Sequence, residues 1–417
     1  MSSGMSKTDQ GGSLALAPQY RPELELLLTC GGPHIQATKE ARARELLEAD
    51  LDWERVLRLG MWHHMIPLLH WNLAARRNVG VPDEVQASLK TAFMNNVGRS
   101  LRMTADLIAI LQDMGSQGIE AVPYKGPVLA SRLYGNVSLR QSSDLDIVVC
   151  RADVEGARQS LMRQGYVPFI MLQDSNHKFR MESRYSERFD RGREIVELHW
   201  AFTNKDVAFP LDLSDLMPRM EKHSVGGRAL TVFGSEDLIL ILCVHGAKHG
   251  WNRLEWICGV SEFLYANQDL DWGYLCDRAK ETGSLRRLLL GLLLASCLYE
   301  APLPDRVRRL IASESSVAVL GEQVTKSLFD GDNDPEGAVA FGSIDHDIFH
   351  FKLGDGLLSR LRYFGYRLTT PSQPERWSSV SIAGRSFSLH SFTRPFKVGR
   401  KLISVAIQSL DSNRDQQ

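Results

Sequence analysis

Apolar residues recur at helical spacing in the N-terminal and C-terminal parts of the chain. Before residue 118 this spacing predicts helices over residues 37–50, 53–76 and 83–114, with Pro67 expected to break or kink the second. From Ser235, which is expected to cap a helix, the pattern is again helical and predicts further helices over 255–266, 273–282, 285–300 and 313–330. The chain therefore begins and ends in helical regions.

Between these regions the apolar runs are short and are separated by glycine, proline and polar residues. They predict strands over residues 119–124, 144–150, 166–172 and 193–200, and helices over 127–134 and 152–164. This order predicts an α+β fold, in which a small mixed sheet forms an α/β core between two helical regions. The expected divisions are a disordered segment over 1–18, an N-terminal helical region over 19–117, the core over 118–234 and a mainly helical region over 235–417.

Composition narrows the class of protein. Of the 417 residues 43% are hydrophobic and 24% charged, and the net charge of −1 argues against a general nucleic-acid binder. The six cysteines form no C-x-x-C pair, the N-terminus lacks the apolar core of a signal peptide, and the most apolar run, 288–299, is too short to cross a bilayer. These features predict a reduced cytoplasmic protein without a transmembrane segment. A basic amphipathic stretch over 396–410 predicts a packed terminal helix, with membrane-surface contact as the alternative.

The segment RQSSDLDIVV places Asp144 and Asp146 at the head of an aliphatic strand. Strand alternation puts both side chains on one face, where two carboxylates repel each other and are costly to bury unpaired. Mg²⁺ removes this cost, because it takes carboxylate oxygens and retains water and phosphate oxygens as its other ligands. The pair therefore indicates a metal site for phosphate chemistry. The alternative is a solvated strand end, in which aspartate serves as a turn residue.

The strand REIVELHW supplies a third carboxylate. Alternation places Glu197 and His199 on one face, and Glu194 on the other face with three apolar residues, Val196, Leu198 and Trp200. If this strand neighbours the first, Glu197 converges with Asp144 and Asp146. Three carboxylates can hold two Mg²⁺ ions, or Mn²⁺ as an alternative, one activating the attacking oxygen and one holding a triphosphate. Otherwise Glu197 is a surface residue in an ion pair, and His199 hydrogen-bonds within the sheet or orients a carboxylate or phosphate.

The turn in PYKGPVLA has the features of a phosphate site. Gly126 permits close backbone approach, Lys125 adds a positive charge, and the helix that begins at Pro127 points free N–H groups at the same place. Three further polar residues lie just ahead of the aspartates and could contact phosphate: Arg140, Ser142 and Ser143. Alone, K-G-P is an ordinary turn.

Together, the pattern KG-x(2)-L-x(4)-Y-x(5)-R-x-S-x-D-x-D resembles the nucleotidyltransferase superfamily that includes DNA polymerase β, and more closely the bacterial group of uncharacterised nucleotidyltransferases. The resemblance implies a nucleotidyltransferase core and Mg²⁺-dependent transfer of a nucleoside monophosphate from an NTP to a hydroxyl of an unknown acceptor, releasing pyrophosphate. It also implies that Tyr134, which belongs to the pattern, is a candidate substrate contact. The Gly-Ser turn of the polymerases is here Gly126-Pro127, so Lys125 and Ser142 are candidates for the missing serine's role.

His245 and His249 lie four residues apart on a predicted helix and face the same way. They are candidates for substrate or phosphate contact, for packing, or for a zinc site, although the glutamate of H-E-x-x-H is absent. Two other function classes stay open: a non-catalytic nucleotide-binding regulatory module, which the three intact carboxylates disfavour, and a toxin-like enzyme that modifies tRNA or protein. The sequence does not choose ATP over the other NTPs.

Overall fold

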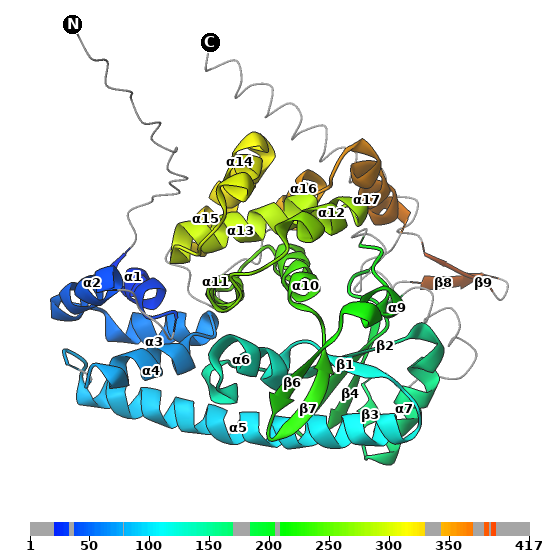
Figure 1. Cartoon of the computed structure of the whole chain (residues 1–417), viewed down its shortest axis with the longest axis horizontal. Helices are drawn as coiled ribbons and strands as arrows, with labels where there is room; N and C mark the ends of the chain where they lie inside the picture. Colours follow the sequence, from blue (N-terminus) through cyan, green and yellow to red (C-terminus); the bar gives the residue numbers. More distant parts are fainter. Residues whose placement is uncertain are drawn as a thin grey trace, which may run out of the picture.

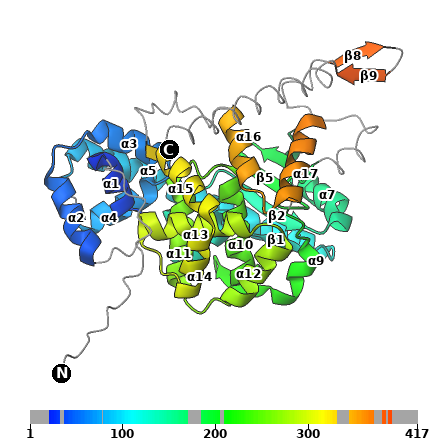
Figure 2. The same ribbon diagram turned by 90° about the horizontal axis from the view of Figure 1, so that it is seen from above.

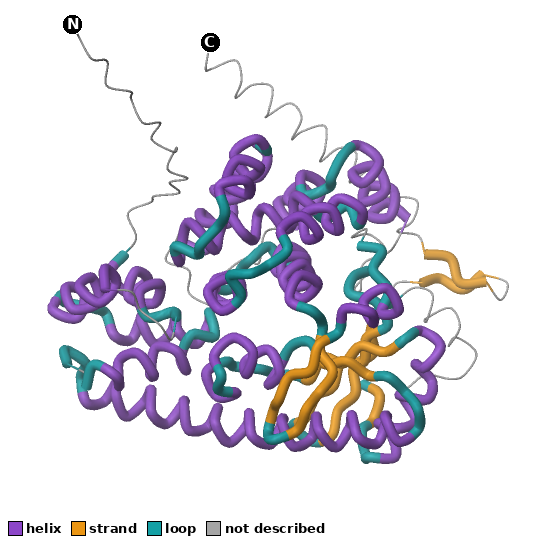
Figure 3. Tube along the Cα trace, viewed as in Figure 1, coloured by secondary structure: helices purple, strands orange, loops and turns teal. Residues whose placement is uncertain are grey.

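The computed structural model describes residues 21–32, 37–77, 79–169, 184–204, 209–329, 343–369, 379–382 and 385–388. The expected disordered segment over 1–18 and the basic stretch over 396–410 lie outside these residues. Figure 1 shows a small sheet beside one long helix, with the remaining helices grouped above and at one end. The chain is an α+β protein, and Figure 3 shows its main strands gathered in one region.

Helices make up the N-terminal region, and the last of them is long. Their bounds are α1 Pro22–Thr29, α2 Ala37–Glu48, α3 Trp53–Trp62, α4 Ile66–Ala75 and α5 Asp83–Ser116. The break predicted at Pro67 is wrong in position: the chain turns at His64, which has a φ of 59°, and Pro67 lies in the first turn of α4, where its missing N–H costs nothing. Helix α5 runs from α4 to the far side of the sheet, so it joins the N-terminal region to the core (Figure 1).

The core is a five-stranded mixed sheet in the order β1-β2-β5-β4-β3. Its elements are β1 Ala121–Pro123, α6 Gly126–Tyr134, η1 Val137–Leu139, β2 Leu145–Val149, η2 Arg151–Asp153, α7 Val154–Arg163, β3 Val167–Pro168, β4 Ser186–Arg191 and β5 Glu194–His199. Strands β2 and β5 are parallel, and the other neighbours are antiparallel. The sequence pattern missed β4, because its residues, SERFDR, are polar apart from one buried side chain, Phe189.

One face of this sheet is apolar and packs on α5 and α7. It carries Leu145, Ile147, Val149, Val196, Leu198 and Trp200, which share a core cluster with Met103, Leu107 and Ile110 of α5. Val196, Leu198 and Trp200, which alternation placed on one face, therefore pack on helices. Because strand side chains alternate, the acidic residues of β2 and β5 emerge on the opposite face.

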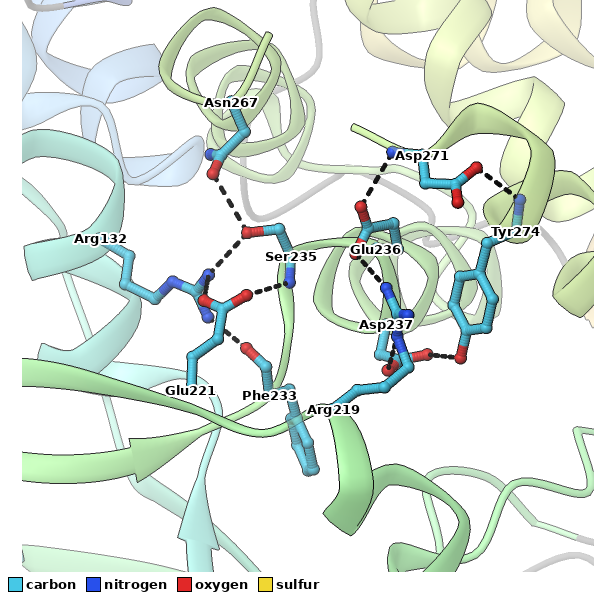
Figure 4. A network of polar contacts seen from close by, with 10 residues as sticks. All are labelled: Arg132, Arg219, Glu221, Phe233, Ser235, Glu236, Asp237, Asn267, Asp271 and Tyr274. Atoms are coloured by element: carbon cyan, nitrogen blue, oxygen red, sulfur yellow. Dashed lines mark hydrogen bonds and ion pairs between the residues drawn. The ribbon is translucent and has the colours of Figure 1, made fainter. Parts of the chain in front are cut away.

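A hairpin, β6 Glu221–Val225 and β7 Arg228–Val232, leads into the C-terminal helices. The expected cap is wrong: Gly234 is the N-cap of α10, and Ser235 is its first residue. Figure 4 shows how polar side chains hold this junction. Arg132 of α6 donates to Ser235 Oγ, and Ser235 donates to Asn267, the C-cap of α11. Glu221 of β6 accepts from the Ser235 N–H. The core and the first C-terminal helices are thereby joined at one point.

The C-terminal region is helical, as expected. Two short helices, α9 Leu213–Leu216 and η4 Met217–Arg219, precede the hairpin. The helices that follow it are α10 Ser235–Lys248, α11 Leu254–Ala266, α12 Trp272–Glu281, α13 Leu285–Tyr299, α14 Asp305–Ser313, α15 Ser315–Phe329, α16 Ser343–Lys352 and α17 Leu357–Thr369. Figure 2 shows these helices beside the N-terminal group. A separate hairpin, β8 Ser379–Ile382 and β9 Arg385–Ser388, follows. Within the described residues, none of the helices has the length and apolar character needed to cross a membrane.

Close packing around Trp251 makes the α10–α13 contact sensitive to added volume. The indole is fully buried, and a Cβ built at Gly246 of α10 would lie 2.4 Å from its ring. We expect Gly246→Ala to lower the free energy of unfolding by about 1–3 kcal/mol, because overpacking forces side chains off their rotamers. Gly115→Ala in α5, where a Cβ meets nothing within 4 Å, is the matched control and should leave stability equal or higher. Urea unfolding measures both, and equal stability of the two variants would contradict the packing argument.

Candidate functional site

The parallel register of β2 and β5 sets Asp146 directly beside Glu197. Asp146 is 4% exposed and Glu197 is half-buried. His199, two residues further along β5, places Nε2 at 3.0 Å from Asp146 Oδ1 and 3.3 Å from Glu197 Oε2. Ligand atoms of these three residues all lie within 4.8 Å of one another. Asp144 precedes β2, lines the same cavity, and accepts a hydrogen bond of 3.2 Å from Ser143 Oγ.

The turn before α6 brings a cation to these carboxylates. Lys125 is the N-cap of α6, and its Nζ lies 3.1 Å from Asp146 Oδ1. Gly126 has a φ of 61°, a conformation that side chains disfavour, and a Cβ there would lie 3.4 Å from the Asp144 carbonyl oxygen. The glycine therefore lets the α6 N-terminus approach the start of β2. The N–H groups of the first turn and the Lys125 ammonium then face the same small volume.

The charges of the cluster interact strongly. Burial alone would raise the pKa of Asp146, but Lys125 and His199 hold it well below its usual range. Burial and the neighbouring Asp146 raise the pKa of Asp144. The hydrogen bond from His199 lowers the pKa of Glu197. Burial disfavours charge on His199, but its bonds to Asp146 and Glu197 raise its pKa. The site thus holds one carboxylate, Asp144, whose negative charge lacks full compensation.

This donor set fits a divalent cation. Carboxylate oxygens and an imidazole nitrogen are ligands for Mg²⁺, Mn²⁺ or Zn²⁺, with carboxylates favouring the harder Mg²⁺ and Mn²⁺. A cation beside Asp146 and Glu197 would also relieve the repulsion that raises the pKa of Asp144. The structure places His199 within the cluster, where the sequence pattern had left its role open. Asp144 lies beside the cluster of three and can join it through an ion.

A cavity of about 310 Å³ opens over the cluster, between the sheet and the helices. One wall comes from the core: Tyr124, Lys125, Ser142, Ser143, Tyr185 and the acidic cluster. The opposite wall comes from α10, α11 and the turn between α3 and α4: His64, His245, Lys248, His249, Arg253, Glu255 and Trp256. Its volume suits a small ligand. All three regions of the chain therefore contribute to the site.

A buried ion-pair network fixes Arg140 at the cavity edge. Arg140 Nη2 lies 2.6 Å from Oε1 of Glu255, which is 3% exposed, and Arg140 also donates to Ser142 Oγ at 3.0 Å. The other oxygen of Glu255 lies 3.0 Å from Nδ1 of His64. Glu255 stands in the first turn of α11, where a negative charge is favoured. The sequence pattern missed Glu255, because an acid at a helix start ordinarily has only this local role.

Aromatic rings form part of the helical wall. The His245 and His249 rings are 4.7 Å apart between centroids, and both lie within 5.4 Å of the Trp256 ring. Burial lowers the pKa of His245 well below its usual value, and Lys125 and His249 add to this effect, so its ring is neutral near pH 7. Within the described residues, this pair converges with no third ligating side chain, which disfavours a zinc site.

The structure brings most of the predicted site residues to one cavity. It is lined by Lys125, Arg140, Ser142, Ser143, Asp144, Asp146, Glu197, His199, His245 and His249, and Gly126 shapes its edge. Tyr134 lies elsewhere: its hydroxyl is 3.9 Å from Cys258 Sγ in the contact of α6 with α11, so it packs these helices together. Besides Glu255, residues that the sequence pattern did not single out include Tyr124, Tyr185, Lys248 and Arg253. Tyr124 directly precedes Lys125, and this adjacency was the one signal that could have found it.

The sequence matches one family of known proteins. Residues 49–300, more than half of the chain, match the model of a family described as uncharacterised nucleotidyltransferase. No curated protein matches the chain. Among solved structures, the chain is similar to the solution structure of the antibiotic-resistance factor ANT(2'')-Ia, with 13% identity and a TM-score of 0.26, over 52% of this chain and 97% of that chain.

The Glu255 network makes a testable contribution to stability. Burial alone would raise the pKa of Glu255, but Arg140 and His64 outweigh it and lower the pKa. A lowered pKa means that this stabilisation is full above the unfolded value, about 4.3, and is lost as the pH falls below it. We expect Glu255→Gln to cost about 2–5 kcal/mol at pH 7, because the buried Arg140 charge loses its partner.

Chemical denaturation at a series of pH values measures this difference. The gap between the wild-type protein and Glu255→Gln should shrink as the pH falls below about 4.3. Glu54→Gln, which removes the partner of Arg58 in an exposed i,i+4 pair, is the control and should change stability little at any pH. A gap for Glu255→Gln that stays constant down to low pH would show that the carboxylate charge is not what stabilises the network.

Proposed function

The chain belongs to the uncharacterised nucleotidyltransferase family, and we propose that it transfers a nucleoside monophosphate from an NTP to an acceptor hydroxyl in a Mg²⁺-dependent reaction that releases pyrophosphate. The observation that carries this proposal is the register of β2 and β5, which sets Asp146 beside Glu197 under a cavity that also holds Asp144 and Lys125. Paired carboxylates next to a cation and a helix N-terminus match the two needs of phosphoryl transfer, a metal site and a phosphate site.

Each element of the site has a role in this reaction. Asp144, Asp146 and Glu197 would hold the metal, which neutralises phosphate charge and lowers the pKa of a bound hydroxyl when present. Lys125 and the first-turn N–H groups of α6 bind the triphosphate oxygens, and Arg140, held by Glu255, adds a second cation at the cavity edge. Ser142 and Ser143 also line the cavity, and each offers a hydroxyl donor. His199 holds Asp146 and Glu197 in a fixed orientation.

The charges on the wall formed by α10 and α11 indicate which kind of acceptor could bind. Apart from Asp144, Asp146 and Glu197, the one other carboxylate among the described lining residues is Glu255, which is already paired with Arg140 and His64. An acceptor with several positively charged amines would need unpaired acids on this wall. The wall presents Lys248, Arg253 and aromatic rings instead, which favours a neutral or anionic acceptor. The intact acidic cluster favours catalysis over a purely regulatory nucleotide-binding module.

A direct assay tests the proposed reaction. The protein is incubated with Mg²⁺, cell extract and each of the four α-³²P-labelled NTPs, and the labelled products are separated by size and chemistry. We expect label from one or more NTPs to reach an acceptor, and Asp146→Asn to reduce this at least about 100-fold, because an amide cannot replace a carboxylate ligand. The amide keeps the shape of the side chain, and relief of the repulsion on Asp144 offsets the lost ion pair with Lys125, so we expect the variant to keep a cooperative thermal transition. Full transfer by Asp146→Asn would exclude the metal assignment.

Glu197 and Glu194 provide a matched pair on one strand. Glu197 joins the acidic cluster and can take the proton of the acceptor hydroxyl, whereas Glu194 points to the other side of the sheet. We expect Glu197→Gln to lower kcat by about 10²–10⁴-fold with little change in NTP affinity, the range of a general base. Glu194→Gln should change kcat less than about threefold, since it touches no reacting group. A larger loss for Glu194→Gln than for Glu197→Gln would refute the assignment.

A further inference from the structure

A second, larger cavity begins on the α5 side of the sheet and extends round the start of β5 to β4. It has a volume of about 850 Å³ and runs between α5 and the β4–β5 hairpin. Its α5 side extends from Met94 to Asp106, which corresponds to a length of about 18 Å at 1.5 Å per residue. We call it the α5 groove. Such a length exceeds what a single small anion needs and suits an extended ligand.

Arginines dominate the charge of the α5 groove. Arg99, Arg102, Arg188 and Arg193 line it, and all four are exposed. Its acids are largely neutralised: Asp190 pairs with Arg188 at 2.8 Å, and Asp106 pairs with Arg191 at 2.7 Å.

Two of the arginines have no partner in the structure. Within the described part of the chain, Arg102 and Arg193 make no hydrogen bond or ion pair, and Arg99 donates to one backbone carbonyl. Glu194 is the one remaining acid of the lining. Arg99, Arg102 and Arg193 therefore leave the α5 groove positive, on a chain whose net charge is −1.

The α5 groove meets the catalytic cavity at Ser143. This residue lines both spaces, and its carbonyl oxygen accepts the hydrogen bond from Arg99 Nη2 at 3.0 Å. The next residue is Asp144 of the candidate metal site. A ligand in the α5 groove can therefore reach past Ser143 and present one end to the acidic cluster. Exposed Phe169, whose ring lies 4.6 Å from the Arg188 guanidinium, adds an apolar surface at the groove's outer side.

We propose that the α5 groove binds the phosphate groups of an extended acceptor, whose hydroxyl end enters the catalytic cavity past Ser143. The ligand chemistry is that of several phosphate groups in a row, because guanidinium groups bind phosphate through charged, often paired hydrogen bonds. Calling this ligand an acceptor rests on the proposed nucleotidyl transfer, but its binding in the α5 groove does not depend on turnover. A short single-stranded nucleic acid and a small molecule with two phosphates are the two sources of this chemistry.

Binding is measured on the full chain carrying Asp146→Asn, so that no transfer occurs. The probe is a 5′-fluorescein-labelled tetranucleotide of uridine, followed by fluorescence anisotropy at several salt concentrations without Mg²⁺. Adding Arg102→Ala and Arg193→Ala should weaken binding at least tenfold, and should reduce the slope of log affinity against log salt by about 1.4, at 0.7 for each lost phosphate contact on a single strand. The control adds Arg306→Ala and Arg309→Ala in α14, which removes the same charge from two exposed positions that do not line the groove. It should change affinity less than twofold.

Competition identifies the source of the phosphates. Fructose 1,6-bisphosphate that displaces the probe, with a dependence on Arg102 and Arg193, supports a small phosphorylated acceptor. Tight tetranucleotide binding that the bisphosphate does not displace supports a nucleic-acid end. Equal loss of binding in both double variants, or no binding of either probe, overturns the proposal. A loss of NTP affinity in Arg102→Ala/Arg193→Ala also overturns it, because the α5 groove would then serve the nucleotide. Failure of the wild type to transfer label from any NTP would refute the proposed function and leave these binding results standing.

Discussion

The structure is organised around the cost of placing like charges side by side. The β2–β5 register sets the almost fully buried Asp146 against Glu197, with Asp144 two residues away. Carboxylates this close cannot all stay charged without compensation. Lys125 from the α6 turn and His199 from β5 supply part of it, and both bond to the same oxygen of Asp146. A divalent cation would compensate the remaining negative charge, so the fold itself creates a candidate site for one.

This requirement explains why three regions of the chain meet at one cavity. The core alone supplies the acids and Lys125, and its sheet leaves that face open. Helices α10 and α11 cover it, and the turn between α3 and α4 supports α11 through His64 and Glu255. Through Glu255 the same contact holds Arg140 at the cavity edge. The N-terminal region therefore lines the cavity with His64 and also positions Arg140 through Glu255. A core cut out of the chain would lose both contributions.

Strand alternation made much of the site predictable from sequence. It placed Glu197 and His199 together and Glu194 with Trp200 on the opposite face, and the glycine after Lys125 marked the helix start. What the pattern could not reveal came from tertiary contacts. Glu255 looks like any acid in a first helical turn, β4 is a polar strand near the sheet edge, and the turn at His64 carries neither glycine nor proline. The Gly226-Gly227 pair between β6 and β7 is a hairpin signal, although no hairpin was predicted there.

The same alternation accounts for the relation between the two cavities. At the start of β2, Asp144 and Asp146 face the catalytic cavity, while Leu145 turns to the α5 groove. Ser143, just before the strand, is not yet confined to either face and lines both. A ligand crossing this point passes from an arginine-lined surface to an acidic one within a few residues. Such a change of charge suits a molecule with phosphates along its length and a hydroxyl at its end, since the phosphates are attracted where the arginines lie and the hydroxyl requires a metal-bearing acidic site.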